Sequence, residues 1–180
     1  MRLVCYLAHC LLNANAKVDE GARCAGVSTP VLSLLREHGA VIRQMPCPEL
    51  AFGGTRRFWA VREQYDTIAH RRHCRRIVEP LAAAITAHVQ RGDEVVLIGV
   101  EGSPSLGVAL TSSDPARGGK PEWPDGAPEL APGQGIFLEE LHAALARAGV
   151  QPPRSLGLTE ALPDHEPDAE RAALGEFLEN

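Results

Sequence analysis

Two cysteines and one serine-rich turn occupy comparable places in this sequence. Cys10 follows the apolar run 3–8, Cys47 follows the run 40–45, and the turn 102–107 follows the run 94–100. Each run predicts a buried strand, and the loops that leave the carboxyl ends of parallel strands meet at one crevice where ligands bind. We therefore expect the three segments to share one site, in which the two thiols are candidate nucleophiles or metal ligands.

The segment around Cys47 holds its thiol in a fixed direction. Pro46 and Pro48 flank the cysteine, and both restrict the backbone of the turn. Glu49 follows two residues after the thiol and is a candidate general acid or base for a bound substrate. This spacing favours acid–base chemistry beside a cysteine.

The turn 102–107 reads Gly-Ser-Pro-Ser-Leu-Gly and offers hydroxyl and backbone N–H donors. Ser103 and Ser105 are candidate catalytic residues because such donors stabilise an anionic sulfur or oxygen. A protonated His9 would favour the thiolate form of its neighbour. Each of these groups also has a structural interpretation: the serines as turn formers, and His9 and Glu49 as solvent-facing side chains.

The five cysteines include no CxxC pair, so a structural zinc knuckle is not expected. Cys5 inside a strand and Cys74 on a helix flank are expected to be buried small hydrophobes. Cys24, in a loop, is compatible with a structural or a functional role. The N-terminus shows no secretory signal, which predicts a cytoplasmic protein with reduced or metal-bound thiols rather than disulfides.

The composition is that of an ordinary globular protein. The chain has 180 residues, is 44% hydrophobic and 23% charged, and carries a net charge of −5. This balance gives no sign of a nucleic-acid partner, and no run reaches the ~18 apolar residues of a membrane span. The arginine-rich stretch 71–76 is expected to be a solvated helix face. The expected partner is a small-molecule substrate, and the oligomeric state is left open.

Strands and helices alternate along the chain, which predicts a single α/β domain over 1–180. The fold class is a three-layer α/β/α sandwich with a mostly parallel, Rossmann-like sheet. Pro80 should kink or divide the longest helix. Residues 111–135 are Pro- and Gly-rich and predict a long surface loop, followed by a C-terminal helical and strand segment over 136–180. The expected strands are 3–8, 40–45, 94–100 and 155–158, and the expected helices are 28–39, 61–89, 136–148 and 166–178.

Three motifs in this order and spacing resemble the 2-thiouracil desulfidase family, and its desulfidase-related subgroup most closely. They are Cys10-Leu11-Leu12-Asn13, then Cys47-Pro48-Glu49 with Gly53-Gly54 and Arg56, then Gly-Ser-Pro-Ser-x-Gly at 102–107. The resemblance covers residues 1 to about 113.

The resemblance implies an enzyme that takes sulfur from a thiocarbonyl compound, such as a thiolated pyrimidine, with a [4Fe-4S] cluster held by three cysteines. Thiolates are the ligands that iron–sulfur clusters take. Carried over, Cys10 and Cys47 would bind iron, while Glu49, Ser103 and Ser105 would handle protons or position the substrate. The residues expected to bind substrate are Asn13, Arg56, Gly102 and Gly107.

The third ligand of the family falls on Leu106, which has no atom that binds iron. A neighbouring cysteine is one substitute, with Cys24 on the best-placed loop and Cys5 and Cys74 less well placed. An oxygen or nitrogen ligand is another, drawn from His9, Glu49 or Glu101. In the third alternative the cluster is lost, and the protein is a small-molecule-binding or accessory protein, or a thiol-dependent enzyme, on the same fold.

Overall fold

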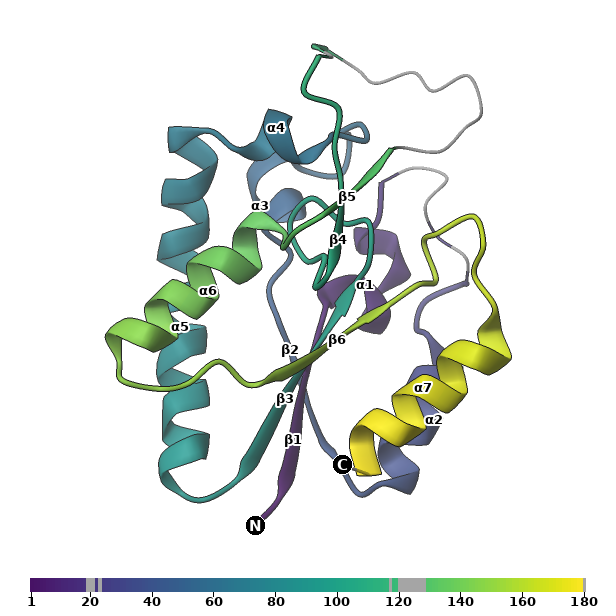
Figure 1. Ribbon diagram of the computed structural model, residues 1–180, viewed down its shortest axis with the longest axis vertical. Coiled ribbons are helices and arrows are strands. Elements are labelled where there is room, and N and C mark those ends of the chain that lie inside the picture. Colours follow the sequence, from purple (N-terminus) through teal and green to yellow (C-terminus); the bar gives the residue numbers. More distant parts are fainter. Residues whose placement is uncertain (19–21, 23, 117, 120–128, 180) are drawn as a thin grey trace.

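Four parallel strands form the sheet at the centre of the computed structural model, which describes all residues except 19–21, 23, 117, 120–128 and 180 (Figure 1). The strands are β1 (Leu3–Leu7), β2 (Val41–Gln44), β3 (Glu94–Val100) and β6 (Arg154–Leu158). Their order is β2-β1-β3-β6. The expected α/β class and all four expected strands are confirmed.

The two central strands are buried along almost their whole length. In β1 and β3 only the first residue keeps partial exposure. Cys5 pairs in register with Ile42 on one side and Val96 on the other. Strands covered on both faces read as continuous apolar runs, which is why the sequence predicts them clearly.

Helices cover both faces of the sheet. The helices α5 (Ile68–Gln90) and α6 (Ile136–Arg147) pack together on one face, and α2 (Thr29–Glu37) and α7 (Pro167–Glu179) lie on the other (Figure 1). The chain leaves β1 towards β2 and later places β3 on the opposite side of β1. This reversal of strand order opens a crevice at the carboxyl ends of β1 and β3.

The long helix expected over 61–89 is two helices, and the break is not at Pro80. A short helix, α4 (Arg62–Tyr65), precedes α5, and α5 continues through Pro80. The break lies at Thr67, whose side chain accepts the backbone N–H of His70 at 3.1 Å and so caps α5. The expected division of the helix at Pro80 is therefore not found, since the helix is interrupted at residues 66–67 instead.

Several segments expected to be loops contain short elements. Cys10 lies in α1 (His9–Leu12), which is followed by η1 (Ala14–Ala16), and Cys47 directly precedes α3 (Pro48–Gly53). The loop expected over 111–135 begins and ends in a two-stranded antiparallel sheet of β4 (Leu110–Ser112) and β5 (Leu130–Pro132). Its central residues, 120–128, lie outside the described part.

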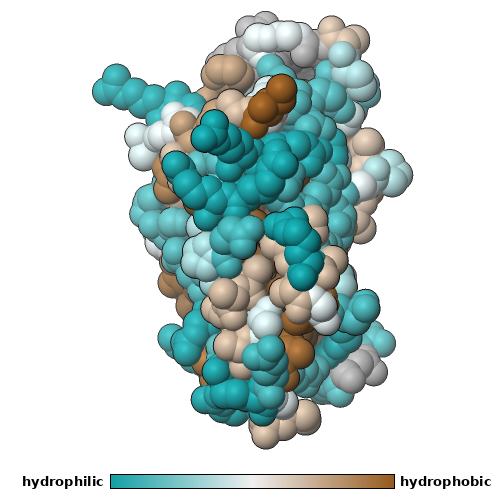
Figure 2. Space-filling view, turned by 90° about the vertical axis from the view of Figure 1, so that its left-hand side faces the viewer, coloured by the Kyte–Doolittle hydropathy of each residue, from teal (hydrophilic) through white to brown (hydrophobic). Residues whose placement is uncertain are grey.

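On the side of the molecule that carries α5, hydrophilic residues cover most of the upper part of the surface, and less polar residues gather in the lower half (Figure 2). Arg71 of the arginine-rich stretch forms ion pairs with Glu139 and Glu140 of α6, and Arg75 with Glu140. The stretch is therefore partly a helix–helix contact rather than only a solvated face.

No helix among the described residues is long and apolar enough to cross a membrane.

Candidate functional site

A pocket of about 110 Å³ opens at the carboxyl edge of the sheet, where the three motifs meet. Cys10 comes from α1 after β1, and Cys47 and Glu49 come from the segment after β2. Gly102 and Ser103 come from the turn after β3. The three strand-end segments therefore line one pocket, as their positions predict. The other lining residues are His9, Ala16, Lys17, Val18, Arg57, Trp59, Ala60, Val100, Glu101, Pro104, Leu106, Leu130, Ala161, Leu162 and Pro163.

Cys47 caps the short helix α3 with its sulfur. Its Sγ accepts the backbone N–H of Leu50 at 3.3 Å, which satisfies one of the donors that a helix start leaves free. Burial and the nearby Glu49 carboxylate raise the pKa of this thiol, while the Leu50 N–H and the Arg57 guanidinium act in the opposite direction. On balance the thiol form is favoured, and the Leu50 N–H and Arg57 partly offset the cost of negative charge on the sulfur.

Glu49 lies at the centre of a small polar network. Its Oε2 is 3.7 Å from Nε of Arg57, and its Oε1 accepts a hydrogen bond of 3.4 Å from the Ser103 hydroxyl. Ser105 is fully buried nearby, but its Oγ makes no hydrogen bond of ordinary length. Burial raises the pKa of Glu49, whereas Arg57 and the two serines oppose that rise. A carboxyl group in this setting suits both proton uptake and proton release.

Arg57 is fixed by the loop that follows α3. Its guanidinium donates to the carbonyl oxygen of Gly54 at 3.1 Å and to that of Ala16. Gly54 has φ of +74°, a conformation that favours glycine, and it ends α3. The Gly53-Gly54 pair therefore turns the chain so that Arg57 returns to the carboxylate of the same segment.

Cys10 supplies the second thiol of the pocket. Burial raises the pKa of this thiol to about 12, and the ammonium of Lys17 partly opposes the rise. Lys17 lines the same pocket and forms an ion pair with Glu160, in which both side chains are about 11% exposed. Glu160, Cys47 and Glu49 raise the pKa of Cys10 further, because negative charge on these groups disfavours the Cys10 thiolate.

The turn 102–107 is held in place from two directions. The carboxylate of Glu101 accepts backbone N–H groups from Val108, Ala109 and Leu110, the last at 2.7 Å. On the other side, the N–H groups at the start of α6 donate to carbonyl oxygens of residues 104 and 105. Gly135 allows this approach, because a Cβ there would lie 2.2 Å from the Ser105 backbone. The turn is thus a rigid wall of the pocket.

A comparison with protein families matches residues 4–122 to the model of a family described as "Putative 2-thiouracil desulfurase". The match spans well over half of the chain and includes all three motifs. The chain belongs to this family. The resemblance stated from the motifs is therefore confirmed.

Two individual proteins are similar to this family member. An uncharacterized protein of Methanocaldococcus jannaschii is 31% identical over 100 residues, which are 56% of this chain and 64% of that protein. This chain thus matches less than two thirds of the length of that relative. A solved [4Fe-4S]-dependent thiouracil desulfidase aligns with 86% of this chain and 89% of its own, at 24% identity and a TM-score of 0.46.

The pocket lining includes five of the ten residues expected at the site: Cys10, Cys47, Glu49, Gly102 and Ser103. Ser105 is buried near Glu49 but is not part of the lining. Arg56 is exposed and lies outside the pocket, and its neighbour Arg57 lines it instead. Asn13 does not line the pocket; its side chain accepts the backbone N–H of Asn15 and caps η1. Gly107 is also absent from the lining, and a Cβ there would lie 2.1 Å from the Leu110 carbonyl oxygen. Its role in the structure is close packing.

Cys24 does not line the pocket that holds Cys10 and Cys47. It is exposed and lines a second pocket, of about 240 Å³, against α2 and α7, together with Ser28 and His165. Cys5 and Cys74 are fully buried in the core, as expected.

The described residues do not supply the three thiolates that the family resemblance implies for a [4Fe-4S] cluster. Cys10 and Cys47 line the pocket, and the third position is Leu106, which is 4% exposed and belongs to the core. Among the described residues, no group of three or more His, Cys, Asp or Glu side chains is arranged to hold a metal ion. The donor set seen in this family member therefore does not fit a cluster held by three cysteines.

Sequence reasoning missed two residues that shape the pocket. Arg57 was missed because two adjacent arginines look alike without the geometry of the loop. Lys17 lies in a polar segment with no periodic signal, and its ion pair with Glu160 joins residues that are 143 positions apart. A lysine seven residues after the first thiol is the only local hint.

Proposed function

We propose that the pocket binds a small heterocyclic thiocarbonyl compound, such as a thiolated pyrimidine, and releases its sulfur as hydrogen sulfide. The observation that carries this proposal is the convergence of Cys10, Cys47 and Glu49 in one pocket of a chain from the 2-thiouracil desulfurase family. Thiols suit a sulfur-containing substrate, and a buried carboxyl group can give a proton to the departing sulfur.

The polar network gives each group a role in this proposal. Arg57 holds the Glu49 carboxylate in place, and the Ser103 hydroxyl donates a hydrogen bond to that carboxylate. The rigid turn 102–107 forms a wall against which the substrate ring rests. Lys17, which lines the pocket and is paired with Glu160, places a positive charge near the Cys10 thiol.

Sulfide release from 2-thiouracil under anaerobic conditions tests the function. Cys47→Ser and Glu49→Gln should each abolish most of the release, whereas Cys24→Ser should leave it unchanged because Cys24 lies in the second pocket. Equal sulfide release by wild type and Cys47→Ser would contradict the proposal.

A second candidate function is binding of the same class of compound without turnover. The observation that favours it is Leu106, which replaces a donor group that the family's chemistry implies. Isothermal titration calorimetry with 2-thiouracil separates the two candidates. Binding that is lost in Glu49→Gln, without any release of sulfide by wild type, would support the binding protein.

A further inference from the structure

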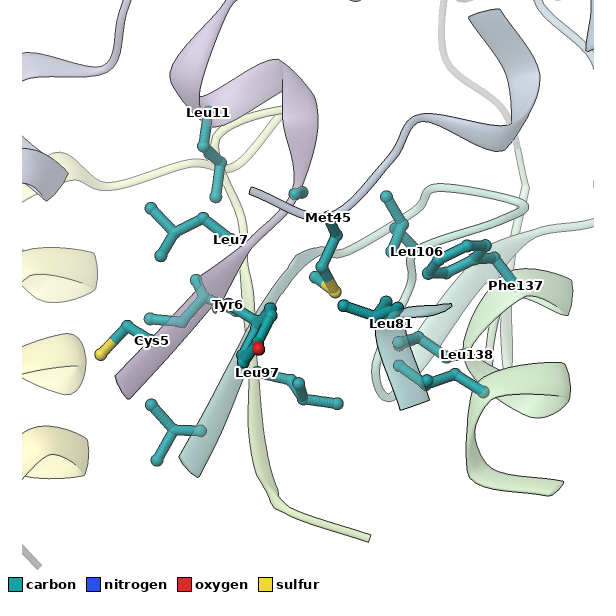
Figure 3. Packing of buried hydrophobic residues seen from close by; sticks show 14 of the residues in the cluster. Cys5, Tyr6, Leu7, Leu11, Met45, Leu81, Leu97, Leu106, Phe137 and Leu138 are labelled. Atoms are coloured by element: carbon teal, nitrogen blue, oxygen red, sulfur yellow. The ribbon is translucent and has the colours of Figure 1, made fainter. Parts of the chain in front are cut away.

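Leu106 belongs to the hydrophobic core as much as to the pocket. The N–H groups of Phe137 and Leu138 donate to the carbonyl oxygen of Ser105, which ties the segment before Leu106 to the start of α6. Figure 3 shows the Leu106 side chain directed to the same region as Phe137. The third ligand position is thus filled by a packed aliphatic side chain that the rigid turn holds in place.

Among the described residues, His9 and the two pocket thiols do not form a group arranged to hold a metal ion. The two carboxylates that line the pocket are already engaged with other groups. Glu101 accepts three backbone N–H groups, and Glu49 faces Arg57 and Ser103. The groups of the pocket that remain available to react are the two thiols, Cys10 and Cys47. A pair of thiols with a neighbouring carboxylate is a poor ligand set for a cubane cluster, but it is sufficient for nucleophilic catalysis.

We propose that this pocket removes sulfur by cysteine-based hydrolysis, with Cys47 as the nucleophile, and does not require a [4Fe-4S] cluster. This inference rests on the proposed function and adds the reacting atom to it. Cys47 is favoured over Cys10 because its Sγ already accepts the Leu50 N–H, which stabilises negative charge on the sulfur. The flanking Pro46 and Pro48 limit the movement of the turn that carries it.

The reaction balances without an oxidant or a reductant. The Cys47 sulfur forms a bond to the thiocarbonyl carbon, the thiol proton passes to Glu49, and Glu49 returns it to the substrate sulfur. The C–S bond to that sulfur then breaks, a ring N–H supplies the second proton, and hydrogen sulfide leaves. The substrate carbon stays attached to Cys47 as a thioimidate. Water adds to that carbon with Glu49 as base, and the Cys47 thiol departs, so that in sum a thiocarbonyl and water become a carbonyl and hydrogen sulfide.

Iron-free and reconstituted samples of the full chain test the inference. One sample is treated with an iron chelator, the other is incubated anaerobically with iron and sulfide, and both receive 2-thiouracil. We expect the chelator-treated protein to release many sulfides per chain. We also expect Cys47→Ser to lower that rate at least about 100-fold, and Cys24→Ser not to change it. Release only by the reconstituted sample would overturn the cluster-free route and leave the proposed function standing. Release of sulfide by neither sample would contradict both the cluster-free route and the proposed function.

A covalent label identifies the nucleophile independently of turnover. Substoichiometric iodoacetamide should label Cys47 before Cys10, and 2-thiouracil should protect Cys47 from labelling, as read by peptide mass mapping. Labelling confined to Cys10, with Cys47 unreactive, would contradict the assignment.

Iron binding by a variant provides the matched comparison. Leu106→Cys restores the third thiol, and after reconstitution this variant should take up more iron and sulfide than wild type and develop stronger visible absorption. Wild type that takes up four irons and four sulfides per chain and releases sulfide only in that state would overturn the inference, whether or not the variant folds.

Discussion

Nε of Arg57 lies 3.7 Å from Oε2 of Glu49 inside the pocket, and the two side chains are only 7% and 17% exposed. The same guanidinium is anchored on the carbonyl oxygens of Gly54 and Ala16. The backbone carbonyl groups therefore hold the Arg57 guanidinium, and the guanidinium in turn positions the Glu49 carboxylate, to which we assign proton transfer. The pair lies within the segment after β2, and the hydrogen bond from Arg57 to the Ala16 carbonyl oxygen ties this segment to the one after β1.

Replacement of Arg57 should slow sulfide release by about 10- to 100-fold, because Glu49 loses the cation that positions it. Arg57→Lys should recover part of the rate, since it keeps the charge. The matched control is Arg56→Gln, which should not change the rate because Arg56 is exposed and outside the pocket. Equal losses in Arg56→Gln and Arg57→Gln would contradict the assignment. Steady-state kinetics with 2-thiouracil provide the measurement.

Glu49→Gln should reduce turnover by about 100- to 10,000-fold, the usual contribution of a positioned acid or base. The amide keeps the shape of the side chain, so the thermal unfolding midpoint should change little. Glu79→Gln serves as the control because Glu79 is an exposed partner of Arg147 and does not line the pocket. A large loss of stability in Glu49→Gln would point to a structural role instead.

Glu101 should matter for stability rather than for chemistry. Its carboxylate accepts backbone N–H groups of Val108, Ala109 and Leu110. Glu101→Gln should therefore lower the free energy of unfolding by about 2–4 kcal/mol, since charged acceptors make strong hydrogen bonds. Glu94→Gln, at a partly exposed ion pair with Arg154, should cost less than about 1 kcal/mol. Urea denaturation of both variants compares the two sites, and equal losses would count against this role of Glu101.

His70 should make the fold less stable in acid. It is fully buried at the start of α5, with Phe52, Tyr65, His73 and Cys74 around it. Burial, together with the smaller effect of the neighbouring His73, lowers the pKa of this histidine to about 4. In the unfolded chain the pKa is about 6.5, so between pH 6.5 and 4 the unfolded state binds more protons.

The free energy of unfolding should thus fall by about 2–3 kcal/mol as the pH drops from 6.5 to 4. His70→Phe removes the titrating group while keeping an aromatic ring, so its stability should depend less on pH over that range. Identical slopes for wild type and His70→Phe in urea titrations at several pH values would contradict this explanation.

The sheet was predictable because its central strands are buried on both faces. Residues such as Val96 and Ile98 have neighbours on all sides, and this burial leaves a continuous apolar run in the sequence. The positions of the three motifs at strand ends then followed from the topology alone. The break before α5 was not predictable in the same way, because the Thr67 cap interrupts an apolar stripe that appears continuous.

The details of the site depended on contacts between distant residues. Cys10 lies in a helix of four residues, which is too short for helical periodicity to be visible. Arg57 and Arg56 are neighbours of the same type, and only the turn at Gly54 decides which one reaches Glu49. The sequence identified the two thiols and the Glu49 carboxyl group of the pocket. The arginine that holds the carboxylate could be identified only from the tertiary structure.

The dependence of sulfide release on iron content tests the central claim most directly. A series of anaerobic preparations, from chelator-treated to fully reconstituted, is assayed for bound iron and for the initial rate of sulfide release from 2-thiouracil. Cysteine-based hydrolysis at Cys47 predicts a rate that is the same across the series, including the iron-free end. A rate that rises in proportion to bound iron and vanishes without it would contradict the account.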